Sequence, residues 1–408
     1  MKSSSSVGKL RFLRPLVIAL CLLLLLLSVF GIASTIPLAL SGRVDFRPFY
    51  TAGYMVRTGQ GREIYNYAAS ERLQNELVSK AEGSLPFIHL AYETLLFAPF
   101  SLLAYRAAYL AFLAFNLLTL AFAFAILKPH LAPLQEIWRW LPLAVFACFL
   151  PVALALIQGQ ASIMLLALMI LSMSALEGGN DVLAGMYLGL TLFKFQYALP
   201  MAFLFLVWKR WRFLTGFAAT GLAVLGISLW VTGPQAFVSY VHSLGEMSTR
   251  FSAAFGARHG IHPAQMPNLR GLAYVGTGGS QVSSLVITAA SSALAVIWAA
   301  MKRPSFPLAL VAAQLVSYHG LINDTTMMVL PLGLMLSAAA AGKSRSPVWT
   351  GIAASVVFIG PAPLLFFGPR FYLLAIPMVV LFIMLGSDSP DATSFRVGQA
   401  SPLDASAQ

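Results

Sequence analysis

The chain has 408 residues, of which 59% are hydrophobic and only 10% are charged. This composition excludes an ordinary soluble globular domain, in which roughly half of the residues are apolar and about a quarter are charged. The net charge of +12 does not indicate a nucleic-acid partner, because the Lys and Arg residues lie mostly in short loops between apolar runs, where they orient a membrane protein.

Long apolar runs recur from Pro15 almost to Gly386, and a helix needs about 20 such residues to cross a hydrocarbon core. Lipid offers no partner for an unpaired backbone group, so these spans must be helices. The segments predict an all-α, polytopic membrane bundle of about 10–12 spans, forming a single domain over residues 1–386. The predicted segments are 15–40, 88–104, 107–127, 140–157, 161–176, 182–207, 213–232, 282–300, 305–318, 325–341, 347–367 and 371–386.

The first segment, 15–40, follows a basic N-terminus and is too long for the apolar part of a cleaved signal peptide, which has about 7–15 residues. We therefore expect an uncleaved first span with its N-terminus in the cytoplasm. Strict alternation then predicts outer loops 41–87, 128–139, 177–181, 233–281 and 319–324. The tail, 387–408, is predicted to be cytoplasmic and disordered.

The turns that alternation leaves inside carry basic residues and no acid, as expected for cytoplasmic loops. They contain Arg106, Lys209, Arg210, Arg212, Lys302, Arg303, Lys343 and Arg345. The outer loops hold nearly all the acids outside the tail. We therefore expect chemistry on the periplasmic or extracellular side of an inner (plasma) membrane. Gln158 and Gln160 fall inside, away from the other candidates, and are interpreted as structural.

Asp45 stands a few residues after the first span and is flanked by Arg43 and Arg47. A carboxylate held at the outer membrane edge can act as a general base on a hydroxyl group. The alternative is a surface ion pair worth less than about 1 kcal/mol. Position alone leaves both readings open.

Lys194 lies in the middle of a predicted span, close to Gln196. Charged residues at such depth are costly, so this lysine is expected to bind a phosphate or to pair with an acid on another span. The alternative is a lysine whose ammonium reaches the interface along its flexible stem. The mid-span position favours a function.

Two further polar groups lie in predicted outer loops. His319, Asn323 and Asp324 can bind a phosphate or a sugar, or form a polar turn in which Asp324 caps the next helix. Two potential ligands without a third give only a weak metal signal, so no metal site is predicted. Asn268 and Arg270 suit phosphate because the guanidinium is a permanently charged fork, although an ordinary loop arginine is the alternative.

No Rossmann fingerprint, Walker A run, nucleophile elbow or HExxH motif occurs. The chain also has no segment that would form a soluble nucleotide-binding domain. We therefore expect no cofactor, and a lipid-linked substrate in place of a nucleotide-linked one.

Four groups of residues occur in a specific order over about residues 40–340. They are Asp45-Phe46, Phe49-Tyr50, Ala52-Gly53, Gly59 and Ile64-Tyr65; Tyr92 with Phe97-Ala98-Pro99; Gly159-Gln160, Ala184-Gly185 and Lys194; and Met266 to Gly271 with the polar pair before Met328 to Pro331. Together they resemble glycosyltransferase family 87, multispan enzymes of the GT-C superfamily related to polyprenol-phosphate-mannose-dependent mannosyltransferases.

The resemblance implies a GT-C-like fold and transfer of a hexose from a polyprenyl-phosphate donor in the membrane to a glycan or glycolipid acceptor. Asp45 matches the family's acidic base, which deprotonates the acceptor hydroxyl and gives inversion. Mannose is the default sugar. By residue type we assign Lys194 and Arg270 to the leaving phosphate. The remaining candidate substrate-binding residues are Tyr50, Tyr92, Asn268, His319 and Asp324.

The chain departs from the family pattern twice. Tyr92-Glu93-Thr94 replaces a frequent Tyr-Pro-Pro, and Asn323-Asp324 replaces a frequent His-Asp. These changes leave the donor and acceptor open. The main alternative is a transporter or flippase of a lipid-linked or small solute, although the matched halves typical of many transporters are not found. A non-catalytic scaffold is a third reading.

Overall fold

The computed structural model describes residues 14–80, 84–249, 262–366, 368 and 370–387. Within them all regular structure is helical and no strand occurs, which confirms the all-α prediction. By length and composition, seven helical stretches among the described residues can cross a membrane, and the bent pair α8–α9 adds an eighth. The seven are Arg14–Leu40, Tyr105–Gln135, Asp181–Val207, Trp211–Leu244, Gln281–Ala300, Ile322–Ala340 and Pro347–Phe366.

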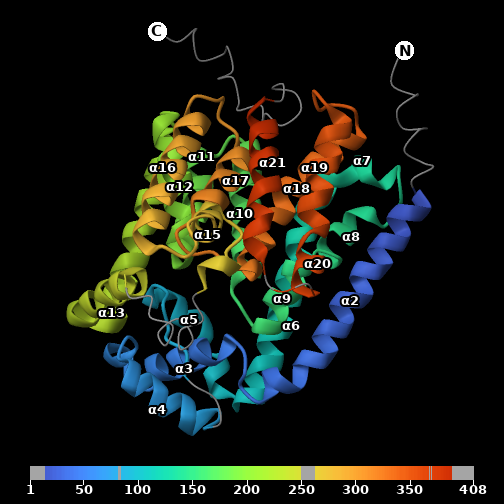
Figure 1. Cartoon of the computed structure of the whole chain (residues 1–408). Coiled ribbons are helices and arrows are strands. Elements are labelled where there is room, and N and C mark those ends of the chain that lie inside the picture. Colours follow the sequence, from blue (N-terminus) through green and yellow to red (C-terminus); the bar gives the residue numbers. More distant parts are fainter. Residues whose placement is uncertain (1–13, 81–83, 250–261, 367, 369, 388–408) are drawn as a thin grey trace, which may run out of the picture.

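α2 (Arg14–Leu40) runs along one side of the bundle (Figure 1), and side chains such as Leu26 and Phe30 are exposed along it. Such an apolar surface suits a lipid environment. Beyond its end the chain forms a layer of short helices, which we call the Asp45 end of the bundle. The layer contains α3 (Phe46–Arg57), η1 (Gly61–Glu63), α4 (Tyr67–Leu77), η2 (Ala91–Glu93), α5 (Thr94–Phe97) and η3 (Phe100–Leu102), where η marks a 3-10 helix.

The predicted span 88–104 is wrong, because these residues form η2, α5 and η3 within this layer. Their apolar side chains pack on protein: the ring of Phe97 lies 4.9 Å from that of Phe49 and 5.0 Å from that of Phe112. A stretch that buries its aromatic residues in this way needs no lipid around it. The chain therefore stays at the Asp45 end until α6.

α6 (Tyr105–Leu127) leads to the opposite end, where η4 (Lys128–Leu131) and α7 (Ala132–Gln135) lie (Figure 1). α8 (Leu141–Ala147) and α9 (Leu150–Gln158), bent by 45°, return to the Asp45 end, and α10 (Ser162–Glu177) leaves it again. The prediction that separated Gln158 and Gln160 from Asp45 is wrong, since the Asp45 N–H donates to Gln158 Oε1 at 3.2 Å.

The stretch Asp181–Val207 is long enough to cross a membrane, but it folds back on itself as a hairpin and does not form the single predicted span. Its parts are α11 (Asp181–Gly189), η5 (Leu190–Lys194) and α12 (Phe195–Val207). Arg210 Nη2 donates to Asp181 Oδ2 at 2.8 Å, so the hairpin begins and ends at the same end of the bundle. A straight helix of this length would separate the two residues by about 40 Å. Lys194 stands at the turn, where its backbone leaves the helical conformation (φ −117°, ψ 61°).

The false span 88–104 and the hairpin 181–207 each shift the predicted sides by one crossing, so the two shifts cancel for the loops after the hairpin. Between them, the predicted sides are reversed: loops 128–139 and 177–181 lie opposite the Asp45 end, as the 2.8 Å contact between His130 and Glu177 and the Arg210–Asp181 pair show. Arg106 instead lies at the Asp45 end, next to Tyr105, whose ring is 5.8 Å from that of Phe46. After the hairpin the predicted alternation and the structure agree again.

The rest of the bundle follows regular up-and-down connections (Figure 1). Gly233, with φ 75°, bends α13 at the Asp45 end. The helices are α13 (Trp211–Thr249), η6 (Pro263–Gln265), α15 (Leu269–Gly276), α16 (Gln281–Ala300), α17 (Phe306–Val316), η7 (Ile322–Met328), α18 (Val329–Ala340), α19 (Pro347–Ile359), α20 (Pro361–Phe366), η8 (Phe371–Leu374) and α21 (Ala375–Ser387).

The hairpin is held in place by a glycine seam between α11 and α13. A Cβ atom on Gly185 would lie 1.8 Å from the Phe213 carbonyl oxygen, and one on Gly216 would lie 1.9 Å from the Val182 carbonyl oxygen. Only glycine lets two helix backbones approach so closely, which is how membrane helices gain packing energy where lipid removes the hydrophobic drive. The seam fixes the depth at which η5 presents Lys194.

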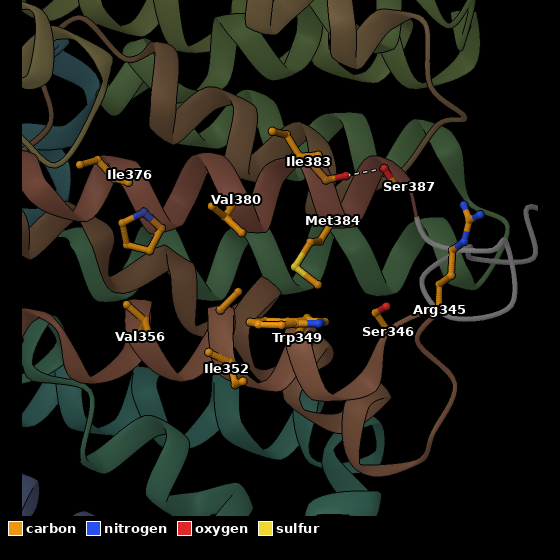
Figure 2. A pocket seen from close by; sticks show the side chains of 12 residues that line it. Arg345, Ser346, Trp349, Ile352, Val356, Ile376, Val380, Ile383, Met384 and Ser387 are labelled. Carbon is orange, nitrogen blue, oxygen red and sulfur yellow. Dashed lines mark hydrogen bonds between the residues drawn. The ribbon is translucent and has the colours of Figure 1, made fainter.

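Figure 2 shows a groove of about 700 Å³ between α19 and α21. Apolar side chains such as Trp349, Ile352 and Val380 line it, and Arg345 lies near one end. Trp349 is 66% exposed, so this groove faces the surroundings of the bundle. None of the predicted site residues lines it, and it is not the candidate site.

The corrected path of the chain predicts which loops share a side. Single cysteines at Thr58 and Arg106 are expected to react with an impermeant maleimide from one side of sealed vesicles, and cysteines at Glu136 and Lys343 from the other. All four residues are exposed, while the native Cys21 and Cys148 are buried, so the wild-type chain is the unlabelled control. Labelling of Arg106→Cys and Lys343→Cys from one side would contradict this path.

Candidate functional site

Asp45 ends the short turn after α2 and precedes the first residue of α3. It occupies the N-cap position, but its side chain makes no capping hydrogen bond. Its Oδ2 atom instead accepts a hydrogen bond of 2.6 Å from Gln160 Nε2. Among the residues that the structure describes, Asp45 forms no ion pair. This argues against the surface ion pair with Arg43 or Arg47, and Arg47 donates to Asn75 Oδ1 and the Ser79 carbonyl.

Close contact between α3 and the turn after α9 makes the Gln160 hydrogen bond possible. Gly159 ends α9 in the left-handed conformation (φ 62°), which glycine adopts without steric cost. A Cβ atom there would lie 2.6 Å from Phe46 Cβ, so a larger residue would push α3 away. Gln158 and Gln160 stand on either side of this glycine, and both bind Asp45.

Burial raises the pKa of the Asp45 carboxyl above its usual value, because desolvation disfavours the charged form. The hydrogen bond from Gln160 and the positive charge of Lys194 oppose this effect, while the charge of Asp324 adds to it. The side chain also keeps some solvent exposure. Asp45 is therefore a carboxylate with enhanced basicity that a hydroxyl group can reach.

Lys194 and Asp324 form a buried ion pair next to Asp45, with side-chain exposures of 3% and 4%. Lys194 Nζ donates to Asp324 Oδ1 and also lies 3.4 Å from Gln160 Oε1. The structure thus shows the predicted pairing of Lys194 with an acid on another segment, and its ammonium does not reach the interface. Through Gln160, the pair is linked to the carboxylate of Asp45.

Asp324 is well supplied with donors. Besides Lys194, Ser162 Oγ donates to Oδ1 at 3.1 Å, and the Leu321 N–H donates to Oδ2 at 3.1 Å. The second contact is that of a capping box: Asp324 is the third residue of η7, and its side chain accepts from the N-cap N–H, so it does not itself occupy the N-cap position that the sequence suggested. Asp324 therefore joins η7 to α10 and η5.

Tyr92 and Tyr50 act on the backbone near the site. The Tyr92 hydroxyl accepts from the Phe193 N–H and donates to the Leu190 carbonyl, both at 2.8 Å, which closes the hairpin turn that carries Lys194. The Tyr50 hydroxyl donates to the Leu103 carbonyl at 2.9 Å and ties α3 to the end of η3. In this structure, the hydroxyls of both residues hold the framework.

Asn268 and Arg270 shape the loop that carries His319. Asn268 caps α15 through the Gly271 N–H at 3.0 Å and donates to the Ser317 carbonyl at 2.9 Å. Arg270 Nη1 donates to the Tyr318 carbonyl at 2.8 Å, and its guanidinium lies 3.8 Å from the centre of the Tyr318 ring. Arg270 still brings a positive charge towards the site, since that charge acts on the pKa of His319.

His319 belongs to the same electrostatic neighbourhood. Burial lowers its pKa to about 4, and the charges of Arg270 and Lys194 act in the same direction while Asp324 opposes them. The imidazole is therefore neutral at neutral pH. It can donate or accept a hydrogen bond, but it does not supply a positive charge.

Gln160, Ser162 and His89 were missed as members of the cluster, and Glu93, which contacts His89, was noted only as a departure from the family pattern. The polar run Gln158-Gly159-Gln160 was noticed, but the false span 88–104 placed it on the wrong side. The structure gathers Asp45, Lys194, Asp324 and His319, and Arg270 lies near them. In the described part of the chain, no group of three His, Cys, Asp or Glu side chains is close enough to hold a metal ion.

The Lys194–Asp324 pair predicts a specific pattern of stability. Lys194→Met or Asp324→Leu alone leaves a buried charge without its partner, which costs roughly 3–5 kcal/mol. The double variant removes both charges and is expected to lose less stability than the sum of the single losses. Thermal unfolding of the purified variants in one detergent measures this. Strict additivity would mean that the two residues do not interact.

Comparison with known proteins found no match among curated proteins or solved structures. The family model of glycosyltransferase family 87 matches residues 92–331, which is more than half of the chain. The matched region includes Gln160, Lys194, Asn268, Arg270 and Asp324, and so carries most of the cluster that surrounds Asp45. The protein belongs to glycosyltransferase family 87.

Proposed function

We propose that this membrane glycosyltransferase moves a hexose from a polyprenyl-phosphate donor to a hydroxyl group of a glycan or glycolipid, with Asp45 as general base. The proposal rests on the contacts and the burial of the Asp45 carboxylate. Its carboxylate caps no helix and pairs with no cation among the described residues, yet Gln160 holds it in a buried, charged cluster. Because the Asp45 carboxylate neither caps a helix nor pairs with a cation among the described residues, it is available for proton transfer.

The proposed reaction is a displacement at the anomeric carbon of the donor sugar. Asp45 takes the proton of the acceptor hydroxyl as that oxygen forms a bond to the anomeric carbon. The bond from the anomeric carbon to the phosphate oxygen breaks, and polyprenyl phosphate leaves with the electron pair. Attack opposite the leaving group inverts the anomeric configuration. The raised pKa makes Asp45 a better base near neutral pH than an ordinary aspartate.

Lys194 and Arg270 support this chemistry in different ways. The Lys194 ammonium is already bound by Asp324, so its main effect is to orient Gln160 and to place positive charge near Asp45. Arg270 supplies a permanent positive charge beside His319, suited to the phosphate of the donor. His319 can donate or accept a hydrogen bond beside these charges, and Asn268 holds the loop that carries it.

We further propose that the Asp45 end faces the periplasm or the cell exterior and that the protein resides in the inner (plasma) membrane. Basic residues in short loops favour the cytoplasmic side. The loops between α12 and α13, between α16 and α17 and between α18 and α19 lie at the end opposite Asp45 (Figure 1). In the sequence these loops and the first turn of α13 contain Lys209, Arg210, Arg212, Lys302, Arg303, Lys343 and Arg345. A polyprenyl-linked donor suits this side, which lacks the nucleotide sugars of the cytoplasm. We propose mannose as the default sugar and a GT-C-like architecture, which the multi-span helical bundle supports.

The central prediction concerns Asp45→Asn. Removal of a general base lowers the rate by about 10²–10⁴-fold. Purified protein in lipid nanodiscs, given a panel of polyprenyl-phosphate hexoses and glycolipid acceptors, should release polyprenyl phosphate in a way that depends on Asp45. Glu63→Gln, an exposed acid of the same layer, is the matched control and should keep its activity. Movement of lipid-linked sugar across vesicles without transfer would favour a flippase.

The pH dependence gives a second prediction. The base acts only when ionised, so kcat/KM rises with pH through the pKa of Asp45. The Gln160 hydrogen bond lowers that pKa. Gln160→Leu is therefore expected to move the acidic limb of the kcat/KM profile to higher pH. Gln158→Leu removes a contact to the Asp45 backbone only, and its acidic limb should stay in place. Equal limbs in wild type and Gln160→Leu would contradict the assignment of Asp45.

A further inference from the structure

A second buried carboxylate near the site has a single partner. Glu93 lies four residues after His89, and His89 Nδ1 lies 2.5 Å from Glu93 Oε2. The Glu93 side chain has no solvent exposure, and its other oxygen is a buried atom without a hydrogen-bond partner. A carboxylate in this setting must either be paired with a cation or keep its proton, because an isolated buried charge is very costly.

Two electrically neutral states place the shared proton in the short contact between Nδ1 and Oε2, and both put a hydrogen on His89 Nε2. A proton on Glu93 Oε1 would be a buried donor without an acceptor, since that atom has no partner. If Glu93 is ionised, His89 is an imidazolium and carries hydrogens on both ring nitrogens. If Glu93 is protonated, it donates to Nδ1, and the neutral ring carries its hydrogen on Nε2. The remaining state, an ionised Glu93 beside a neutral ring, would leave a net negative charge in a dry environment. Nε2 is therefore a hydrogen-bond donor.

His89 lies close to the residues of the candidate site. Its ring centroid lies 5.1 Å from that of Phe49 on α3 and 6.3 Å from that of Phe193, the neighbour of Lys194. It is also close enough to Asp45 and to His319 for its charge to influence both of their pKa values. Nδ1 faces Glu93, while the His89 side chain keeps 10% exposure. Among described residues no group is hydrogen-bonded to Nε2.

We propose that His89, held by Glu93, is a phosphate-binding residue that donates from Nε2 to an oxygen of the polyprenyl-phosphate group. This inference rests on the proposed function. As the phosphate gains negative charge on leaving, the proton shared by the pair can move from Glu93 to Nδ1. The ring then becomes an imidazolium while the total charge of the pair stays at zero. A positive charge thus forms beside the leaving phosphate without a proton being taken from water.

The test measures binding of the reaction product, which needs no turnover. Wild type and His89→Gln are placed in nanodiscs of zwitterionic lipid, and affinity is measured for a long-chain polyprenyl monophosphate and for the uncharged polyprenol of the same length. Glutamine keeps a polar contact to Glu93 but cannot take up the shared proton. Loss of one charge-assisted hydrogen bond is expected to weaken phosphate binding about tenfold or more and to leave polyprenol binding unchanged.

The chain offers a matched control, because His130 and Glu177 form a second histidine–carboxylate pair at the opposite end of the bundle. His130→Gln should leave both affinities unchanged. If His89→Gln does not fold, Glu93→Gln provides the same comparison, since it keeps the size of the side chain and removes the shared proton.

The possible results distinguish a failure of the proposed role of His89 from a failure of the proposed function. Equal phosphate affinity in wild type and His89→Gln would overturn the role of His89 and leave the proposed function standing. A wild-type protein that does not prefer polyprenyl phosphate over polyprenol would overturn both. An equal, His89-dependent affinity for an anionic phospholipid would also overturn the assignment, because the site would then recognise any lipid phosphate and not the donor.

Discussion

Two charged side chains within the spanning part of the bundle, Lys194 and Asp324, hold the site together. Neither is tolerable alone at such depth, so each fixes the other, and their contact ties the turn of the α11–α12 hairpin to η7. Ser162 and the Leu321 N–H supply the remaining bonds to Asp324. Gln160 extends the same network to Asp45. The position of the proposed base therefore depends on a charge pair that does not itself react.

The surrounding helices serve this network. The glycine seam sets the depth of the hairpin, and the Tyr92 hydroxyl closes its turn. Gly159 lets α3 approach the turn after α9 closely enough for Gln160 to reach Asp45. The seam and the Tyr92 contacts involve backbone atoms, and Gly159 leaves no room for a side chain beside Phe46, so the framework tolerates little change of shape. In contrast, the groove of Figure 2 is lined by exposed apolar side chains and lies apart from the charged cluster.

Much of this was predictable from the sequence. Apolar length gave the helical bundle, and the position of Asp45 after the first span marked it as a candidate. The pairing of Lys194 with an acid followed from the cost of a charge at mid-span. The sides of the loops were harder, because hydropathy does not distinguish a span from a stretch such as 88–104 that buries its aromatic residues in protein. Nor does it show that α11 and α12 fold back on each other. Gln160 and His89 were missed for this reason, since their neighbours come from segments far apart in the sequence.

The hairpin also has a consequence for how the chain is made. Lys194 and its partner are separated by 130 positions, so the lysine enters the translocation machinery long before Asp324 has been synthesised. Until η7 arrives, the growing polypeptide must shelter an uncompensated ammonium, in the bilayer or within the insertion apparatus. The hairpin that carries Lys194 can therefore reach its final position only after the last third of the chain has been made. A truncated product would carry an exposed charge that quality-control proteases can recognise.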